Sequence, residues 1–284
     1  GTPALPGRTI GPNFMTDLIT LAIGLALAGV LSGFLAGLFG IGGGAILVPI
    51  LITAFPLLGV DAAITAHMAV GTSLAIIIPT AFRSYIVHRK KGAGNAEMLR
   101  DWAIWVPLGV IIASFIVGYV SGDVLRVVFA AVALVIAVKM LFNRANWVFA
   151  RDLPPRPVTN GVGFGIGFLS TFMGIGGGNL NNLFMTSFGQ SIHQAVATSA
   201  GLGILISIPA TVGYIYAGWG HPDLPVGSLG YVNLLAAALV VPFSMLAAPW
   251  GARVAHAMPA RRLEIVFGLF LLVVIARMVA DVVM

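Results

Sequence analysis

Long apolar stretches, broken by glycines, prolines and short polar segments, run through most of the chain. The breaks divide it into ten apolar segments, most of which can cross the roughly 30 Å hydrocarbon core of a bilayer as one helix. Segments 44–57 and 178–188 are too short to do so and are predicted to be half-helices. The pattern therefore predicts an all-α integral membrane protein, with segments at 16–39, 44–57, 65–87, 102–120, 124–143, 158–174, 178–188, 192–217, 228–250 and 261–282.

Two of the apolar stretches contain no Asp, Glu, Lys or Arg. One lies between Asp17 and Asp61, and the other lies between Arg156 and Asp223. As single helices they would measure roughly 65 and 100 Å at about 1.5 Å per residue, two to three times the thickness of the bilayer core. Each stretch must therefore fold back within the membrane.

The second half of the chain repeats the first. Gly33-Phe-Leu-Ala-Gly-Leu-Phe-Gly-Ile-Gly-Gly-Gly44 recurs as Gly167-Phe-Leu-Ser-Thr-Phe-Met-Gly-Ile-Gly-Gly-Gly178, and Ala69–Ser73 recurs as Ala195–Ser199. An odd number of segments in each half makes the second copy enter the membrane upside down. We therefore expect two inverted repeats of about five helical segments each, with helices broken at the Gly-Gly-Gly motifs. The predicted divisions are an N-terminal tail at 1–15, repeat 1 at 16–143, a cytoplasmic linker at 144–157 and repeat 2 at 158–284.

The basic residues set the expected orientation, because the cytoplasmic loops of membrane proteins are enriched in Lys and Arg. If the first segment runs from outside to inside, most of the 15 basic residues lie at cytoplasmic ends. We therefore expect a bacterial inner-membrane protein with cytoplasmic basic loops and with both termini outside. The residues at cytoplasmic ends are Arg83, Arg89, Lys90, Lys91, Arg100, Lys139, Arg144, Arg151, Arg156, Arg253, Arg261 and Arg262, and those outside are Arg8, Arg126 and Arg277.

Composition narrows the class of protein. Apolar residues make up 59% of the chain and charged residues 8%, against roughly 25% charged residues in soluble domains, which excludes a soluble enzyme. The chain contains no cysteine, which excludes disulfides and thiolate chemistry within it. The net charge of +6 is assigned to the cytoplasmic loops and predicts no nucleic-acid partner.

The sequence lacks the signatures of common enzymes. Gly40-Ile-Gly-Gly-Gly-Ala45 matches the Rossmann G-x-G-x-x-A pattern, but no strand is predicted before it and it lies in a charge-free membrane stretch. The motifs of P-loop enzymes, zinc proteases and serine hydrolases are absent. We therefore expect no catalysis, no cofactor and no metal site.

The two Gly-Gly-Gly breaks are the strongest candidates for a binding site. A break in a membrane helix exposes backbone N–H and C=O groups that lipid cannot satisfy, so it must face protein or a cavity. A half-helix begins at each break, and its free N–H groups and positive dipole end would point at the break. We expect them to bind an anion without a formal charge, through Gly42, Gly43, Gly44, Gly176, Gly177 and Gly178, whereas Gly29, Gly33 and Gly37 suit close helix packing.

Gly40-Ile-Gly-Gly-Gly-Ala-Ile-Leu-Val-Pro-Ile-Leu51 and its second copy from Gly174 resemble the duplicated glycine signature of the sulfite exporter TauE/SafE family, also called the toluene sulfonate uptake permease family. The resemblance covers nearly the whole chain. It implies a membrane carrier for sulfur-containing oxyanions such as sulfite or an organosulfonate, for example sulfoacetate. The second copy departs from the pattern, with Leu183 in place of Pro49 and with Asn179, Asn181 and Asn182 in place of Ala45, Leu47 and Val48.

Polar side chains near the breaks complete the candidate site. The amides of the three asparagines suit sulfonate or carboxylate oxygens, and bonding between helices is their alternative role. The hydroxyls of the duplicated Thr-Ser motifs either line the site or bond to their own helix. Two histidines, a glutamine and an arginine are candidates to bind substrate or carry a proton, and they equally suit helix ends or the membrane interface. These residues are Asn179, Asn181 and Asn182, then Thr72, Ser73, Thr198 and Ser199, then His67, His193, Gln194 and Arg83.

Further side chains are expected at the membrane interface. Lys139 and Arg277 occupy corresponding positions in the two repeats and would extend towards opposite membrane faces. Four tryptophans near segment ends would anchor the helices at the interface, namely Trp102, Trp105, Trp147 and Trp219.

The acidic residues bear on the direction of transport. None of the nine lies in the middle of a predicted segment, so a carboxylate proton relay is not expected. An inside-negative potential favours the exit of an anion by about 2.3 kcal/mol per charge per 100 mV. The sequence therefore predicts a secondary transporter that exports a small anion across the lipid bilayer by alternating access. An anion channel, or a sulfonate uptake permease coupled to sodium or protons, is the alternative.

Overall fold

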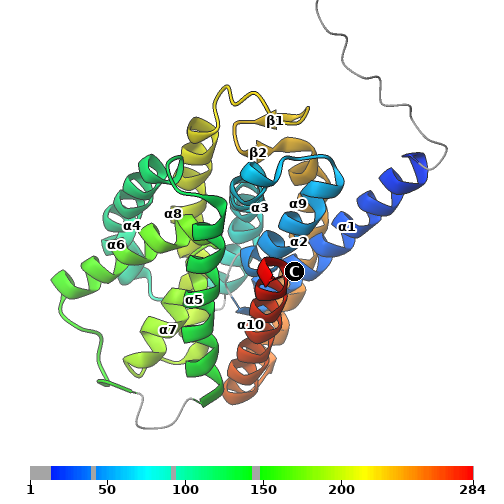
Figure 1. The fold of residues 1–284 in the computed structure, drawn as a ribbon. Helices are drawn as coiled ribbons and strands as arrows, with labels where there is room; N and C mark the ends of the chain where they lie inside the picture. The colour runs from blue at the N-terminus through cyan, green and yellow to red at the C-terminus, as the bar shows by residue number, and fades with distance from the viewer. Residues whose placement is uncertain (1–13, 40–42, 91–93, 143–147, 284) are drawn as a thin grey trace, which may run out of the picture.

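The computed structural model describes residues 14–39, 43–90, 94–142 and 148–283, which form ten helices and one two-stranded hairpin (Figure 1). The prediction of an all-α fold with ten segments is confirmed. The elements are α1 (Phe14–Phe39), α2 (Gly44–Leu57), α3 (Ala62–Lys90), α4 (Ala96–Val117), α5 (Gly122–Phe142), α6 (Arg156–Met173), α7 (Gly178–Ser187), α8 (Ile192–Ala217), β1 (Ser228–Leu229), β2 (Val232–Asn233), α9 (Leu234–Ala257) and α10 (Ala260–Val283).

Two helices, α4 and α9, begin furthest from the predicted residues, and an asparagine cap explains each difference. The hairpin occupies the start of the segment predicted at 228–250, because α9 starts only after Asn233, whose Oδ1 accepts from the N–H of Ala236 at 2.8 Å. Helix α4 starts well before residue 102, because Asn95 caps it by accepting from the N–H of Met98 at 3.0 Å. A pattern based on hydrophobicity alone missed both caps.

The surface of the bundle suits a lipid environment. Within the described residues, five helices are long and apolar enough to cross a membrane: α3, α4, α5, α8 and α9. Large apolar side chains cover their outer faces, as at Ile104 and Leu246, which are both 72% exposed. In water such a surface would be strongly unfavourable, whereas in a bilayer it faces lipid.

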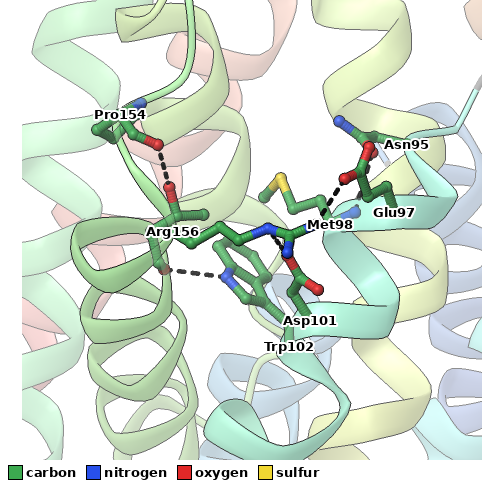
Figure 2. A network of polar contacts seen from close by, with 8 residues as sticks. Asn95, Glu97, Met98, Asp101, Trp102, Pro154 and Arg156 are labelled. Atoms are coloured by element: carbon green, nitrogen blue, oxygen red, sulfur yellow. Dashed lines mark hydrogen bonds and ion pairs between the residues drawn. The ribbon is translucent and has the colours of Figure 1, made fainter.

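The helix ends gather in two groups at opposite ends of the bundle. At what we call the basic end, α3, α5 and α9 finish and α4, α6 and α10 begin. Arg156 at the start of α6 bonds to Glu97 and Asp101 in the first turns of α4, at 2.9 and 3.3 Å (Figure 2). Arg261 at the start of α10 donates to the carbonyls of the last residues of α5. At the other end, which we call the hairpin end, α4 and α8 finish close to each other, and α8 contacts β2.

The first helix of each predicted repeat packs along the fourth helix of the other repeat. Helix α1 lies along α9, and α6 lies along α4 (Figure 1). Glycines allow both close approaches, since Gly33 contacts the backbone of Ser244 and Gly109 contacts the carbonyl of Phe164. The predicted packing role of Gly29, Gly33 and Gly37 is confirmed by their contacts with the backbone of α9. Helices α3 and α8 pack on each other between these two pairs.

Candidate functional site

The two glycine breaks lie against each other inside the bundle. The first separates α1 from α2, and the second separates α6 from α7. Gly44, the first residue of α2, contacts the carbonyl of Gly174 so closely that a side chain at position 44 would clash with it. Val48 lies beside the same glycine. Gly42, which was also predicted to line the site, lies outside the described residues.

Both half-helices begin with an unusual backbone conformation that only glycine adopts easily. Gly43 precedes α2 with φ 81° and ψ −7°, and Gly177 precedes α7 with φ 72° and ψ −6°. Neither helix has a side-chain cap, so the first N–H groups are not satisfied by a cap residue. Successive N–H groups in such a turn form a concave, anion-binding arrangement. The breaks therefore offer neutral donors at the positive ends of two short helices.

Two of the three asparagines on α7 bond to the protein. Asn182 donates from Nδ2 to the carbonyl of Phe39, the last residue of α1, at 3.0 Å, and its Oδ1 accepts from the hydroxyl of Ser199 at 3.0 Å. Asn181 donates from Nδ2 to the carbonyl of Ala195 at 3.1 Å and to Ser199 Oγ at 2.7 Å. Asn182 thus connects the second half-helix to the edge of the first break, while Asn181 fixes α7 to α8.

Asn179, in the first turn of α7, has no partner for its side chain. It is only 1% exposed, yet neither Nδ2 nor Oδ1 makes a hydrogen bond within the part of the chain that the structure describes. Residues three apart share a helix face, so Asn179 lies on the same face as Asn182, which reaches the first break. Most buried polar groups in proteins are hydrogen-bonded, so an amide with two unused atoms requires a partner such as water or a ligand.

The serines and the threonines of the duplicated Thr-Ser motifs have different contacts. Ser73 donates to the carbonyl of Gly174 at 3.0 Å, and Ser199 donates to the carbonyl of Gly178 at 3.3 Å. Both serines of the motifs therefore bond at a break. The threonines lie elsewhere: Thr72 accepts from the N–H of Asn233 at 2.9 Å, and Thr198 accepts from the N–H of Asn95 at 3.0 Å. Each threonine therefore holds the capping residue of a helix in the opposite repeat.

The two candidate histidines occupy corresponding places at opposite ends of the bundle. The Nε2 of His67, on α3, lies 3.2 and 2.9 Å from the carbonyls of Val117 and Val120, where α4 ends. The Nε2 of His193, on α8, lies 3.2 Å from the carbonyl of Met258, where α9 ends. Both histidines bond to helix ends, and neither side chain has a hydrogen bond to the described residues of the glycine breaks.

The other two candidates also lie away from the breaks. Gln194 accepts at its backbone carbonyl from the hydroxyl of Thr198, at 2.8 Å, and its own N–H bonds to Ser191 near the basic end. Arg83 is exposed on α3. The described residues contain no group of three or more His, Asp or Glu side chains that could hold a metal ion.

Two interface assignments from the sequence are wrong. Lys139 is buried and donates from Nζ to Leu183 O, Thr186 Oγ1 and Ser187 Oγ, at 2.9, 2.8 and 2.6 Å. It turns inward because the last turn of α7 presents three oxygens that can accept a further hydrogen bond. Trp102 is fully buried and donates to the carbonyl of Thr159, because the early start of α4 places it inside the helix against α6. Trp105 and Trp219 are exposed as expected, and Trp147 lies outside the described residues.

Sequence comparison agrees with the resemblance noted above. The model of the family "Sulfite exporter TauE/SafE" matches residues 25–278. A "Probable membrane transporter protein" of Haemophilus influenzae is 35% identical over 262 residues, which cover 92% of this chain and 99% of the relative. A relative in Bacillus subtilis, with the same description, is 24% identical over 269 residues, which cover 88% and 94% of the two chains.

A third relative, a "Probable membrane transporter protein" of Methanocaldococcus jannaschii, is 27% identical over 227 residues, which cover 77% of this chain and 80% of the relative. No solved structure matches the chain at a significant level. The family match spans both glycine breaks and all ten helices at least in part. The chain therefore belongs to the sulfite exporter TauE/SafE family and is a multi-pass membrane transporter.

Proposed function

We propose that the protein is a secondary carrier of sulfur-containing oxyanions, sulfite or an organosulfonate, and that it binds them where the two glycine breaks meet. The observation that carries the proposal is the contact of Gly44, at the start of α2, with Gly174, at the end of α6, which brings the two breaks together. Sulfur oxyanions present several acceptor oxygens, and the breaks present backbone N–H donors. Asn179 adds a side-chain donor at the same place.

An uncharged site suits a carrier better than a site with a fixed cation. Helix ends and amides provide enough attraction to replace part of the anion's hydration, while release needs no ion pair to be broken. The serines of the duplicated motifs hold the carbonyls of the breaks, so that the N–H groups stay directed at the anion. Thr72 and Thr198 support the helices around the site and do not bind substrate in this proposal.

Alternating access follows from the relation between the two repeats. Corresponding residues make corresponding contacts at opposite ends of the bundle, as His67 and His193 do, and also Thr72 and Thr198. These exchanged contacts support an inverted duplication around the central breaks. The two repeats would then rock against each other and open the site to one face of the membrane at a time.

The proposed direction is export from the cytoplasm across the inner membrane. The basic end lies in the cytoplasm in this proposal, since Arg89, Arg100, Arg151, Arg156 and Arg262 lie in the helix ends and loops gathered there. The inside-negative potential then drives a monoanion outwards by about 2.3 kcal/mol per 100 mV without a coupled ion.

Counterflow in proteoliposomes tests the proposal. Vesicles loaded with unlabelled sulfite, sulfoacetate, taurine or sulfate are placed in a trace of the same labelled compound. A carrier accumulates label transiently and saturates, for at least one sulfur anion. Absence of counterflow for all four would overturn the substrate assignment, and unsaturable flux without counterflow would identify an anion channel instead.

A further inference from the structure

The side chain of Asn179 has unused hydrogen-bonding atoms of both kinds. Its Nδ2 can donate and its Oδ1 can accept, and neither has a partner although the residue is 1% exposed. Rotating the amide of Asn179 exchanges the two atoms but still leaves one donor group and one acceptor without a partner. The number of unpaired groups therefore does not depend on the assigned orientation of the amide.

A second unused acceptor lies two residues further along the same half-helix. Asn181 Oδ1 has no partner, and its orientation is fixed because Nδ2 must donate to the carbonyl of Ala195. Asn182, by contrast, uses both of its amide atoms within the protein. Residues two apart point to different faces of a helix, so Asn181 Oδ1 does not face the same ligand as Asn179. Asn179 alone therefore presents a donor and an unsatisfied acceptor together.

An oxyanion satisfies the donors of this turn but not its acceptors. Sulfonate oxygens without a proton accept from Nδ2 and from the N–H groups of α7, yet they only repel an amide oxygen. A buried acceptor that stays unpaired after binding weakens the complex. A ligand that carries its own O–H or N–H group would satisfy Asn179 completely.

We propose that the site selects monoanions that carry a hydrogen-bond donor besides their acidic oxygens, such as hydrogensulfite or hydroxyalkanesulfonates. This inference rests on the function proposed above and specifies its substrate class. The donor pairs with Oδ1 of Asn179 and the acidic oxygens face the start of α7. Only the second repeat selects for the donor, because the corresponding positions of α2 hold apolar side chains, namely Ala45, Leu47 and Val48.

A pair of ligands that differ in the donor and in one methyl group tests the inference. Unlabelled 2-hydroxyethanesulfonate and its methyl ether, 2-methoxyethanesulfonate, compete against counterflow of labelled sulfite in proteoliposomes of the unaltered protein. The alcohol is expected to inhibit at a concentration about tenfold lower than the ether, the usual effect of one hydrogen bond. The comparison needs no variant, so it does not depend on whether a substituted protein folds.

Two variants then test whether Asn179 causes the preference for the alcohol. Asn179→Leu removes both amide atoms at similar size and is expected to bring the two inhibition constants together. Asn160→Leu is the matched control, because Asn160 also has an unpaired Oδ1 but lies near the start of α6, at the basic end. This control should keep the tenfold preference for the alcohol.

The outcomes separate the two proposals. Equal inhibition by alcohol and ether, or no inhibition by the alcohol, with sulfite counterflow intact, overturns the donor inference and leaves the carrier standing. Equal inhibition is the result expected if water satisfies Asn179. Loss of the preference in both variants would also overturn the assignment to Asn179. Absence of sulfite counterflow in the unaltered protein counts against the proposed function itself.

Discussion

The asparagines of α7 differ in what they do, although the sequence presents them as one group. Asn181 and Asn182 bond to α8 and α1, whereas Asn179 bonds to nothing in the described residues. For Asn182 the hydrogen bond to Phe39 crosses from one repeat to the other. Its role is therefore to position the break, and Asn179 is the amide that we propose contacts substrate.

Asn182→Leu is expected to lower both stability and transport. The substitution removes the hydrogen bond to the carbonyl of Phe39 and one of the hydrogen bonds of Ser199, and a buried carbonyl that loses its partner costs about 1–3 kcal/mol. Sulfite counterflow should fall severalfold while a folded fraction remains by gel filtration. Thermal unfolding in detergent measures the stability change. Unchanged counterflow and unchanged melting would show that the bond between α7 and α1 is dispensable.

At the scale of elements, α7 is held at both ends by different means. Its start lies in the glycine break, and its last turn is held by Lys139 from α5. A cation at the C-terminal end of a helix is attracted to the negative end of the helix dipole and stabilises the helix. Because α7 has only ten residues, this support lies close to the proposed anion site at the other end.

Lys139→Met is expected to destabilise the protein by about 1–3 kcal/mol, since three charge-assisted hydrogen bonds to the end of α7 are lost. The matched control is Arg156→Gln, which removes ion pairs in which the arginine side chain is 72% exposed (Figure 2). Such exposed pairs contribute at most about 1 kcal/mol. Thermal unfolding should show a larger loss of stability for Lys139→Met than for Arg156→Gln. An equal or larger loss for Arg156→Gln would contradict the role given to Lys139.

The sequence predicted the helices well and the polar contacts poorly. Half-helix α2 and helix α8 have their predicted bounds, because glycines and charges mark their ends. The starts of α4 and α9 depended on single asparagine caps, which hydrophobicity does not record. The bonds of Thr72, Thr198 and Lys139 join residues far apart in the sequence, so no local pattern could have indicated them.

At the scale of the whole molecule, the basic end and the hairpin end are expected on opposite sides of the membrane. The chain has no cysteine, so single cysteines introduced at exposed positions report their side directly. Val226→Cys lies near the hairpin and is 92% exposed in the unaltered protein, and Arg100→Cys lies at the basic end. A membrane-impermeant thiol reagent added to intact cells should label position 226 and reach position 100 only after lysis. The reverse pattern would invert the proposed orientation.

Alternating access requires the two repeats to move against each other, and a disulfide between them should stop transport. A Cβ atom added at Gly118, where α4 ends, would lie 3.6 Å from Cβ of Ala217 at the end of α8, which suits a disulfide. Oxidation of the variant with Gly118→Cys and Ala217→Cys is therefore expected to abolish counterflow, and reduction is expected to restore it.

Gly122→Cys with Ala66→Cys is the control at the same end, because its added Cβ atom lies 3.2 Å from Ala66 within repeat 1. If each repeat moves as a rigid body, this second cross-link leaves counterflow intact. Full activity of the first oxidised pair would exclude rocking of the repeats at the hairpin end.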